Sequence, residues 1–147
     1  MDSSEQLTNL TQAGQASPEL VLAEHIHAGF PSVAADYTER IDITREMVPH
    51  PETTFYARIE GDSMQDAGIF NGDLVVIDRS LKAADGDFVA AYIDGEFTVK
   101  EYRSDPSDQC AWLIPHNKAF KPIRVDKEDA FRVWGVITHT IHYVRAR

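Results

Sequence analysis

The chain has 147 residues, of which 43% are hydrophobic, and a formal net charge of −10. This length fits one domain with a sizeable core. The acidic balance argues against binding to duplex DNA, which requires a basic face.

The cysteine count and the hydrophobic pattern indicate the cellular compartment of the protein. Cys110 is the only cysteine, so no intrachain disulfide can form. No window approaches the ~18 consecutive apolar residues that a membrane helix needs. The N-terminus lacks the basic and apolar regions of a secretory signal. We therefore expect a cytoplasmic protein that does not bind membranes.

The first 37 residues have little apolar periodicity. Residues 1–17 are small and polar and predict a flexible arm. In residues 17–26 (SPELVLAEHI), Ser17 as an N-cap followed by Pro18 favours a short helix, although an extended segment fits equally well. A glycine and a proline close together in residues 27–37 indicate an exposed connecting segment.

From about His50 onward the chain is rich in β-branched and aromatic residues, separated by Gly, Asp, Asn and Pro clusters. Asp94-Gly95 between two such runs is typical of a two-residue hairpin turn. The pattern predicts a mostly β protein, a small, curled, antiparallel β-domain behind a flexible N-terminal arm. The predicted strands are 54–60, 74–78, 87–94, 96–102, 111–115 and 131–144.

Common cofactor and metal patterns are not found. A zinc site needs three or four ligands at recognisable spacing, and the six histidines do not provide it. They are His25, His27, His50, His116, His139 and His142. There is no phosphate-binding glycine-rich loop and no G-x-S-x-G motif. We expect no metal and no cofactor.

Ser63 and Lys100 are the candidates for chemistry. In the segment EGDSMQDAG, Asp62 and Ser63 have the short polar side chains of ordinary turn residues. Lys100 lies on the polar face of a predicted strand, where a lysine is usually solvated. If that face is covered, the ammonium loses water and its pKa falls, so that a neutral lysine can take a proton from a serine hydroxyl.

The combination of motifs is more specific than either residue alone. The segments GDSM, GEFTVK, LIPHNKAFKPI and VWGVI occur in that order, behind AGFPSVAADY near the N-terminus. This set resembles the self-cleaving Ser/Lys peptidases of the LexA and UmuD group, and most closely its UmuD members. The resemblance extends from Ala28 to the C-terminus, about four-fifths of the chain.

The resemblance implies roles for individual residues. Ser63 would be the nucleophile and Lys100 its general base, and the bond that is cut would be Ala28-Gly29. Backbone N–H groups of Asp62 and Ser63 would form the oxyanion hole. One departure is that the segment between Gly29 and Ser63 is about one residue shorter than in the UmuD pattern.

The resemblance also implies an organisation and a function. Residues 1–28 would be an arm that self-cleavage removes, 29–49 a linker and 50–147 the peptidase-like β-domain. The protein would act in SOS mutagenesis. A RecA filament on single-stranded DNA would stimulate cleavage, and the trimmed homodimer would serve a UmuC-like translesion polymerase subunit.

Three alternatives share parts of this pattern. A LexA-like or phage repressor needs a DNA-binding domain ahead of the bond, and 28 residues without Lys or Arg are too few for one. A bacterial signal peptidase needs a membrane anchor. A non-catalytic adaptor with the same fold would stay full length at alkaline pH.

Overall fold

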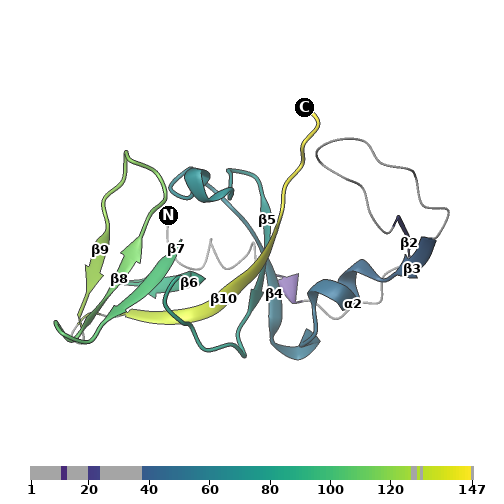
Figure 1. Ribbon diagram of the computed structural model, residues 1–147. Helices are drawn as coiled ribbons and strands as arrows, with labels where there is room; N and C mark the ends of the chain where they lie inside the picture. The colour runs from purple at the N-terminus through teal and green to yellow at the C-terminus, as the bar shows by residue number, and fades with distance from the viewer. Residues whose placement is uncertain (1–10, 13–19, 24–37, 127–128, 130, 147) are drawn as a thin grey trace.

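The computed structural model describes residues 11–12, 20–23, 38–126, 129 and 131–146 (Figure 1). Its strands are β1 (Thr11–Gln12), β2 (Leu20–Ala23), β3 (Thr38–Ile41), β4 (Thr54–Arg58), β5 (Leu74–Asp78), β6 (Phe88–Ile93), β7 (Glu96–Asp105), β8 (Cys110–Ile114), β9 (Ile123–Val125) and β10 (Phe131–Ile141). Its helices are α2 (Ile43–Met47) and the 3₁₀ turns η1 (Pro51–Thr53) and η2 (Gln65–Ala67).

In the described part of the chain, eight strands form one sheet in the order β1-β4-β5-β10-β6-β7-β8-β9, and every neighbouring pair is antiparallel. The long strand β10 pairs with both β5 and β6 and bends across the domain (Figure 1). Its register shifts between Val133 and Gly135 and between Ile137 and His139, and such bulges sharpen a strand's twist. The prediction of a curled antiparallel β-domain is confirmed.

The turn between β6 and β7 also follows the prediction. Asp94 and Gly95 both have positive φ, +48° and +88°, and Ile93 pairs with Glu96 on either side of them. Two successive positive φ angles make the type I′ geometry that matches the twist of a hairpin. This turn fixes the register of β7, and therefore the position of Lys100.

Strand ends differ modestly from the predicted ranges. β10 ends at Ile141 and not at 144, because Ile141 pairs with Leu74, the first residue of its partner β5. β7 continues to Asp105, opposite Cys110 of β8. The short strand β9 was not predicted; it pairs with β8 alone in the described chain.

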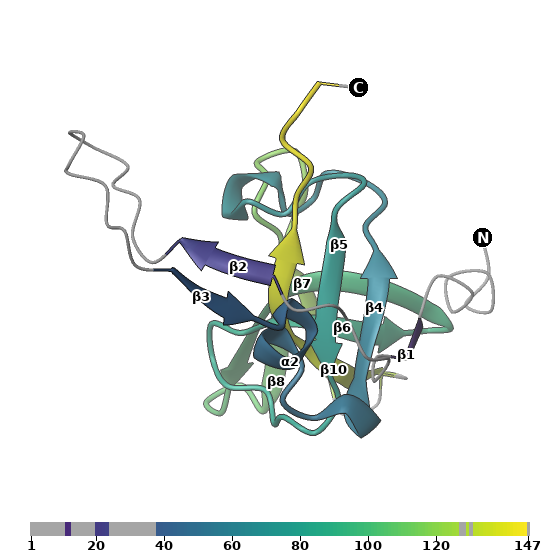
Figure 2. The same ribbon diagram turned by 90° about the vertical axis from the view of Figure 1, so that its right-hand side faces the viewer.

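The N-terminal segments include two short strands outside the main sheet. Residues 20–23 are extended and pair with 38–41, so the extended interpretation of this region is correct and the helix is wrong. Figure 2 shows β2 and β3 side by side, away from the main sheet. Thr11–Gln12, within the predicted arm, pairs with β4. The predicted connecting segment 27–37 lies outside the described residues.

Two hydrophobic clusters cover opposite faces of β6, because side chains alternate along a strand. The first, which underlies the candidate site, consists of Met64, Ile69, Val75, Ile77 and Ala90. The second consists of Val89, Ala91, Leu113, Val125 and Val136. The described part of the chain contains no helix long and apolar enough to cross a membrane.

Candidate active site

Ser63 lies in the turn that follows β4. Gly61 has φ +96°, a conformation that favours glycine, and its N–H donates to Asn71 Oδ1 over 2.9 Å. The next side chain after the serine, Met64, is only 3% exposed and belongs to the first cluster. The core therefore anchors the turn on one side of Ser63, while the serine itself stays half-buried.

A second segment, residues 115–117 after β8, holds the same turn from the other side. The His116 N–H donates to the Ser63 carbonyl over 2.8 Å, and the Asp66 N–H donates to the His116 carbonyl over 2.8 Å. The Asn117 amide donates to the Asp62 carbonyl over 2.9 Å. These bonds fix the backbone that carries the serine hydroxyl.

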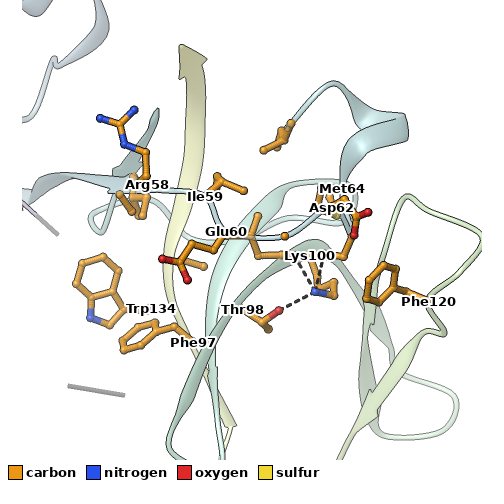
Figure 3. Close-up of a pocket in the computed structure, with 17 residues that line it drawn as sticks. Arg58, Ile59, Glu60, Asp62, Met64, Phe97, Thr98, Lys100, Phe120 and Trp134 are labelled. Carbon is orange, nitrogen blue, oxygen red and sulfur yellow. Dashed lines mark hydrogen bonds between the residues drawn. The ribbon is translucent and has the colours of Figure 1, made fainter. Parts of the chain in front are cut away.

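Lys100 reaches Ser63 from β7. Its Nζ donates to Ser63 Oγ over 3.0 Å, to Thr98 Oγ1 over 2.7 Å and to the Val99 carbonyl over 3.1 Å (Figure 3). Only 7% of Lys100 is exposed. The structure thus brings together the two residues that the sequence singled out.

Burial lowers the pKa of the Lys100 ammonium below its ordinary value. All three hydrogen-bond acceptors of Nζ are uncharged, and in the described chain no carboxylate forms an ion pair with it. A neutral hydroxyl or carbonyl compensates a buried charge less than a carboxylate does. The lowered pKa makes the neutral amine, the form that can accept a proton, easier to reach.

A cleft of about 440 Å³ opens beside this pair. Trp134 and Phe97 lie together on one side of it and Phe120 on the other, next to Lys100 (Figure 3). The rings of Phe97 and Trp134 meet edge to face, with centroids 5.8 Å apart. Glu60 and Asp62 come from the segment that links β4 to the serine turn and also line the cleft. Its largely apolar walls and exposed rim suit an extended polypeptide with apolar side chains.

Among the described residues, the N–H groups of Asp62 and Ser63 donate no hydrogen bond. Unpaired N–H donors next to a nucleophile are what stabilises a developing oxyanion. Their assignment to an oxyanion hole remains a prediction.

Ala28 and Gly29, the predicted cleavage site, lie outside the described residues. They belong to the connection between β2 and β3, whose paired ends are Ala23 and Thr38.

The histidines whose side chains are described serve as hydrogen-bonding partners. His50, His116 and His142 bond to Asp78, Glu101 and Asp73, respectively. His139 contacts the neighbouring Thr138 hydroxyl. Among the described residues, no group of three or more His, Cys, Asp or Glu side chains could hold a metal ion. His25 and His27 lie outside the described residues.

Sequence reasoning missed the contribution of residues 115–117 and of Thr98. Thr98 and Lys100 share a strand face, so period-2 alternation could have indicated their contact. His116 and Asn117 lie within the motif LIPHNKAFKPI, but the motif does not indicate their contact with the serine turn, to which the β7–β8 hairpin brings them.

Comparisons with known proteins identify the family of this chain. The family model Peptidase S24-like matches residues 20–138. Protein SamA of Salmonella typhimurium is 39% identical over 127 residues, which cover 86% of this chain and 86% of SamA. Protein MucA of Escherichia coli is 40% identical over 80% of each chain. The LexA repressor of Corynebacterium jeikeium is 43% identical over 80% of this chain but 44% of its own length. The resemblance to the LexA and UmuD group is confirmed, and the chain belongs to the Peptidase S24-like family.

Proposed function

We propose that this protein is a self-cleaving serine peptidase in which Ser63 is the nucleophile and Lys100 the general base. The observation that carries the proposal is the 3.0 Å hydrogen bond from Lys100 Nζ to Ser63 Oγ, made by a buried lysine at the edge of an open cleft. A nucleophile within hydrogen-bond reach of a base with a lowered pKa is the arrangement that acyl transfer requires.

In the first step, neutral Lys100 takes the proton of Ser63 as Oγ attacks the carbonyl carbon of Ala28. The negative charge that forms on the carbonyl oxygen is stabilised by the backbone N–H groups of Asp62 and Ser63. Lys100 then gives its proton to the amine of Gly29, and the C–N bond breaks. The products are an ester between Ser63 and residue 28 and a free chain that begins at Gly29.

In the second step, Lys100 takes a proton from a water molecule that attacks the ester. The ester bond breaks, Ser63 regains its proton through Lys100, and residues 1–28 leave with a free carboxylate. The lysine acts as base and acid in turn, and therefore its pKa must lie near the working pH.

The choice of Ala28-Gly29 is supported by the neighbouring side chains. Ile26 and Phe30 flank this bond and can occupy an apolar cleft, whereas Gly29 has no Cβ to crowd the attack. Because β2 and β3 are not part of the main sheet, bringing their connection to Ser63 breaks no bond of that sheet. We infer that activation stabilises the arrangement in which this segment occupies the cleft.

The biological setting that we propose is SOS mutagenesis in the cytoplasm. A RecA filament on single-stranded DNA would favour the cleavable conformation. The trimmed chain, residues 29–147, would form a homodimer and act as the accessory subunit of a UmuC-like translesion polymerase. The acidic net charge of −10 supports contact with protein partners in preference to duplex DNA.

The relatives favour this setting over a repressor. The matched region spans 86% of SamA but only 44% of the LexA repressor from Corynebacterium jeikeium. A LexA-like or phage-type regulator and a non-catalytic adaptor are the alternatives. The Lys100–Ser63 contact argues against the adaptor, because burying a lysine without a carboxylate partner costs stability, which a catalytic role at this position would offset.

The proposal is tested by following intact mass over time, with and without RecA, ATP and single-stranded DNA. We expect one new species that lacks residues 1–28 and forms faster when all three are present. Ser63→Ala serves as the control and should stay full length. Full-length wild type under every condition would contradict the peptidase proposal, and cleavage that ignores RecA would contradict the proposed stimulus.

A further inference from the structure

Glu101 is a buried carboxylate directly after Lys100, and the proposed chemistry does not use it. It is 9% exposed. Arg103 Nε donates to its Oε2 over 2.6 Å, and His116 Nε2 donates to its Oε1 over 2.9 Å. Burial raises the pKa of Glu101, but the hydrogen bonds and charges of Arg103 and His116 outweigh this and lower it. The carboxylate is therefore ionised and accepts both bonds.

The two hydrogen-bond partners of Glu101 differ in exposure and in their other contacts. The Arg103 side chain is 53% exposed. The His116 side chain is 30% exposed and packs edge to face on Phe88, with ring centroids 5.4 Å apart. The backbone of His116 bonds to both Ser63 and Asp66. Of the two, His116 is the partner that connects Glu101 to the serine turn.

These contacts form a continuous path between the two reacting groups. It starts at Lys100, passes along β7 to Glu101, crosses the 2.9 Å bond to His116 and ends at the Ser63 carbonyl over 2.8 Å. We infer that Glu101 and His116 act as a brace that positions Ser63 against Lys100. This inference rests on the proposed function, but it assigns new positioning residues to it.

The brace has a defined physical effect. Without the His116 side chain, the 115–117 segment keeps its backbone bonds to the turn, and the adjacent Ile114 still pairs with Glu101, but the side-chain bond to Glu101 is lost. The turn can then move relative to the lysine, and a misplacement of about 1 Å costs roughly 100-fold in rate. Movement would also admit water to Lys100, whose pKa would return toward its ordinary value. Arg58, Glu60 and Asp62 line the cleft with Lys100 from the end of β4 and the serine turn, and all remain in such a variant.

The test compares self-cleavage of full-length wild type, His116→Ala, His116→Gln and Arg103→Ala, at a temperature at which circular dichroism finds all four folded. We expect roughly 100-fold loss in His116→Ala. Most of the rate should return in His116→Gln, whose amide can donate to Glu101. Arg103→Ala, the matched control, removes the other partner of Glu101 and should stay within about twofold of wild type. The pH profile of His116→Ala should also move to higher pH.

Two further measurements test the brace if His116→Ala does not fold or if the protein does not cleave itself. If His116→Ala does not fold, Glu101→Gln replaces it and should cost roughly tenfold. NMR titration of the Lys100 side chain should give a higher pKa in the brace variant than in wild type, even in a protein that does not cleave. Wild type that never cleaves would contradict the proposed function, but this titration would still decide the brace. Two results would overturn the brace. One is a His116→Ala variant whose cleavage rate, pH profile and Lys100 titration match those of wild type. The other is a His116→Gln variant that cleaves no faster than His116→Ala.

Discussion

Asp78 offers a stability prediction whose size follows from its hydrogen bonds. It ends β5 and is 3% exposed. It accepts hydrogen bonds from His50 Nδ1 (2.7 Å), Thr53 Oγ1 (3.0 Å) and both the N–H (2.9 Å) and the hydroxyl (2.7 Å) of Ser80. Burial raises its pKa, but these donors outweigh burial and lower it from 3.8 to about 2. Asp78 therefore ties the segment before β4, which leads from the β2–β3 pair, to the main sheet.

The lowered pKa fixes the direction of the pH dependence. Asp78 stays ionised to lower pH in the folded protein than in the unfolded chain. Its contribution to stability is therefore complete above its pKa in the unfolded chain and is lost as the pH falls toward 2. The shift corresponds to about 2 kcal/mol at pH 7 and about 1 kcal/mol at pH 3. We expect Asp78→Asn to lose these amounts of unfolding free energy relative to wild type.

The assay is urea unfolding of wild type and Asp78→Asn at pH 7, 5, 4 and 3, with exposed Asp66→Asn as the matched control. The deficit of Asp78→Asn should shrink between pH 5 and pH 3, whereas the control should stay within about 0.5 kcal/mol of wild type at pH 7. An Asp78→Asn variant as stable as wild type at pH 7 would refute the reasoning. So would a deficit that is the same at pH 7 and pH 3.

Three further predictions concern the site and its support. Lys100→Arg keeps the positive charge but cannot act as a base, so self-cleavage measured by gel should fall at least about 100-fold. The double variant with Ser63→Ala should cleave no more slowly than Ser63→Ala alone. In Gly135→Ala the added Cβ would lie 2.5 Å from Ile77 Cγ2, so urea unfolding should reveal a loss of about 1–3 kcal/mol, and unchanged stability would contradict the close packing. Residues 29–147 expressed alone should fold and dimerise by circular dichroism and sedimentation; an insoluble or molten product would count against the proposed domain division.

Local patterns were sufficient to predict most of the sheet. Runs of β-branched and aromatic residues predicted six strands, and Asp94-Gly95 predicted the turn that sets the register of β7. β9 was missed because Ile123–Val125 is too short to show a periodicity. The helix suggested after Ser17 was wrong where the structure describes it, because pairing of residues 20–23 with 38–41 outweighs the local N-cap signal.

The site was predictable only as far as the family pattern reached. Ser63 and Lys100 were predicted as a pair, and the structure places them in contact. Glu101 and His116 were not predicted as site residues, since their hydrogen bond depends on which side chains the β7–β8 hairpin brings together. Neither residue type nor spacing in the sequence records that proximity.

The central claim is that Lys100 in its neutral form activates Ser63 to cut one bond. The most direct test is intact-mass analysis of purified wild type, Ser63→Ala and Lys100→Ala across pH 7 to 10, with N-terminal sequencing of any product. We expect wild type to yield one product beginning at Gly29, at a rate that rises with pH toward the pKa of Lys100, and both variants to stay full length. A product beginning elsewhere, a rate that is flat with pH, or substantial cleavage in Lys100→Ala would contradict the account.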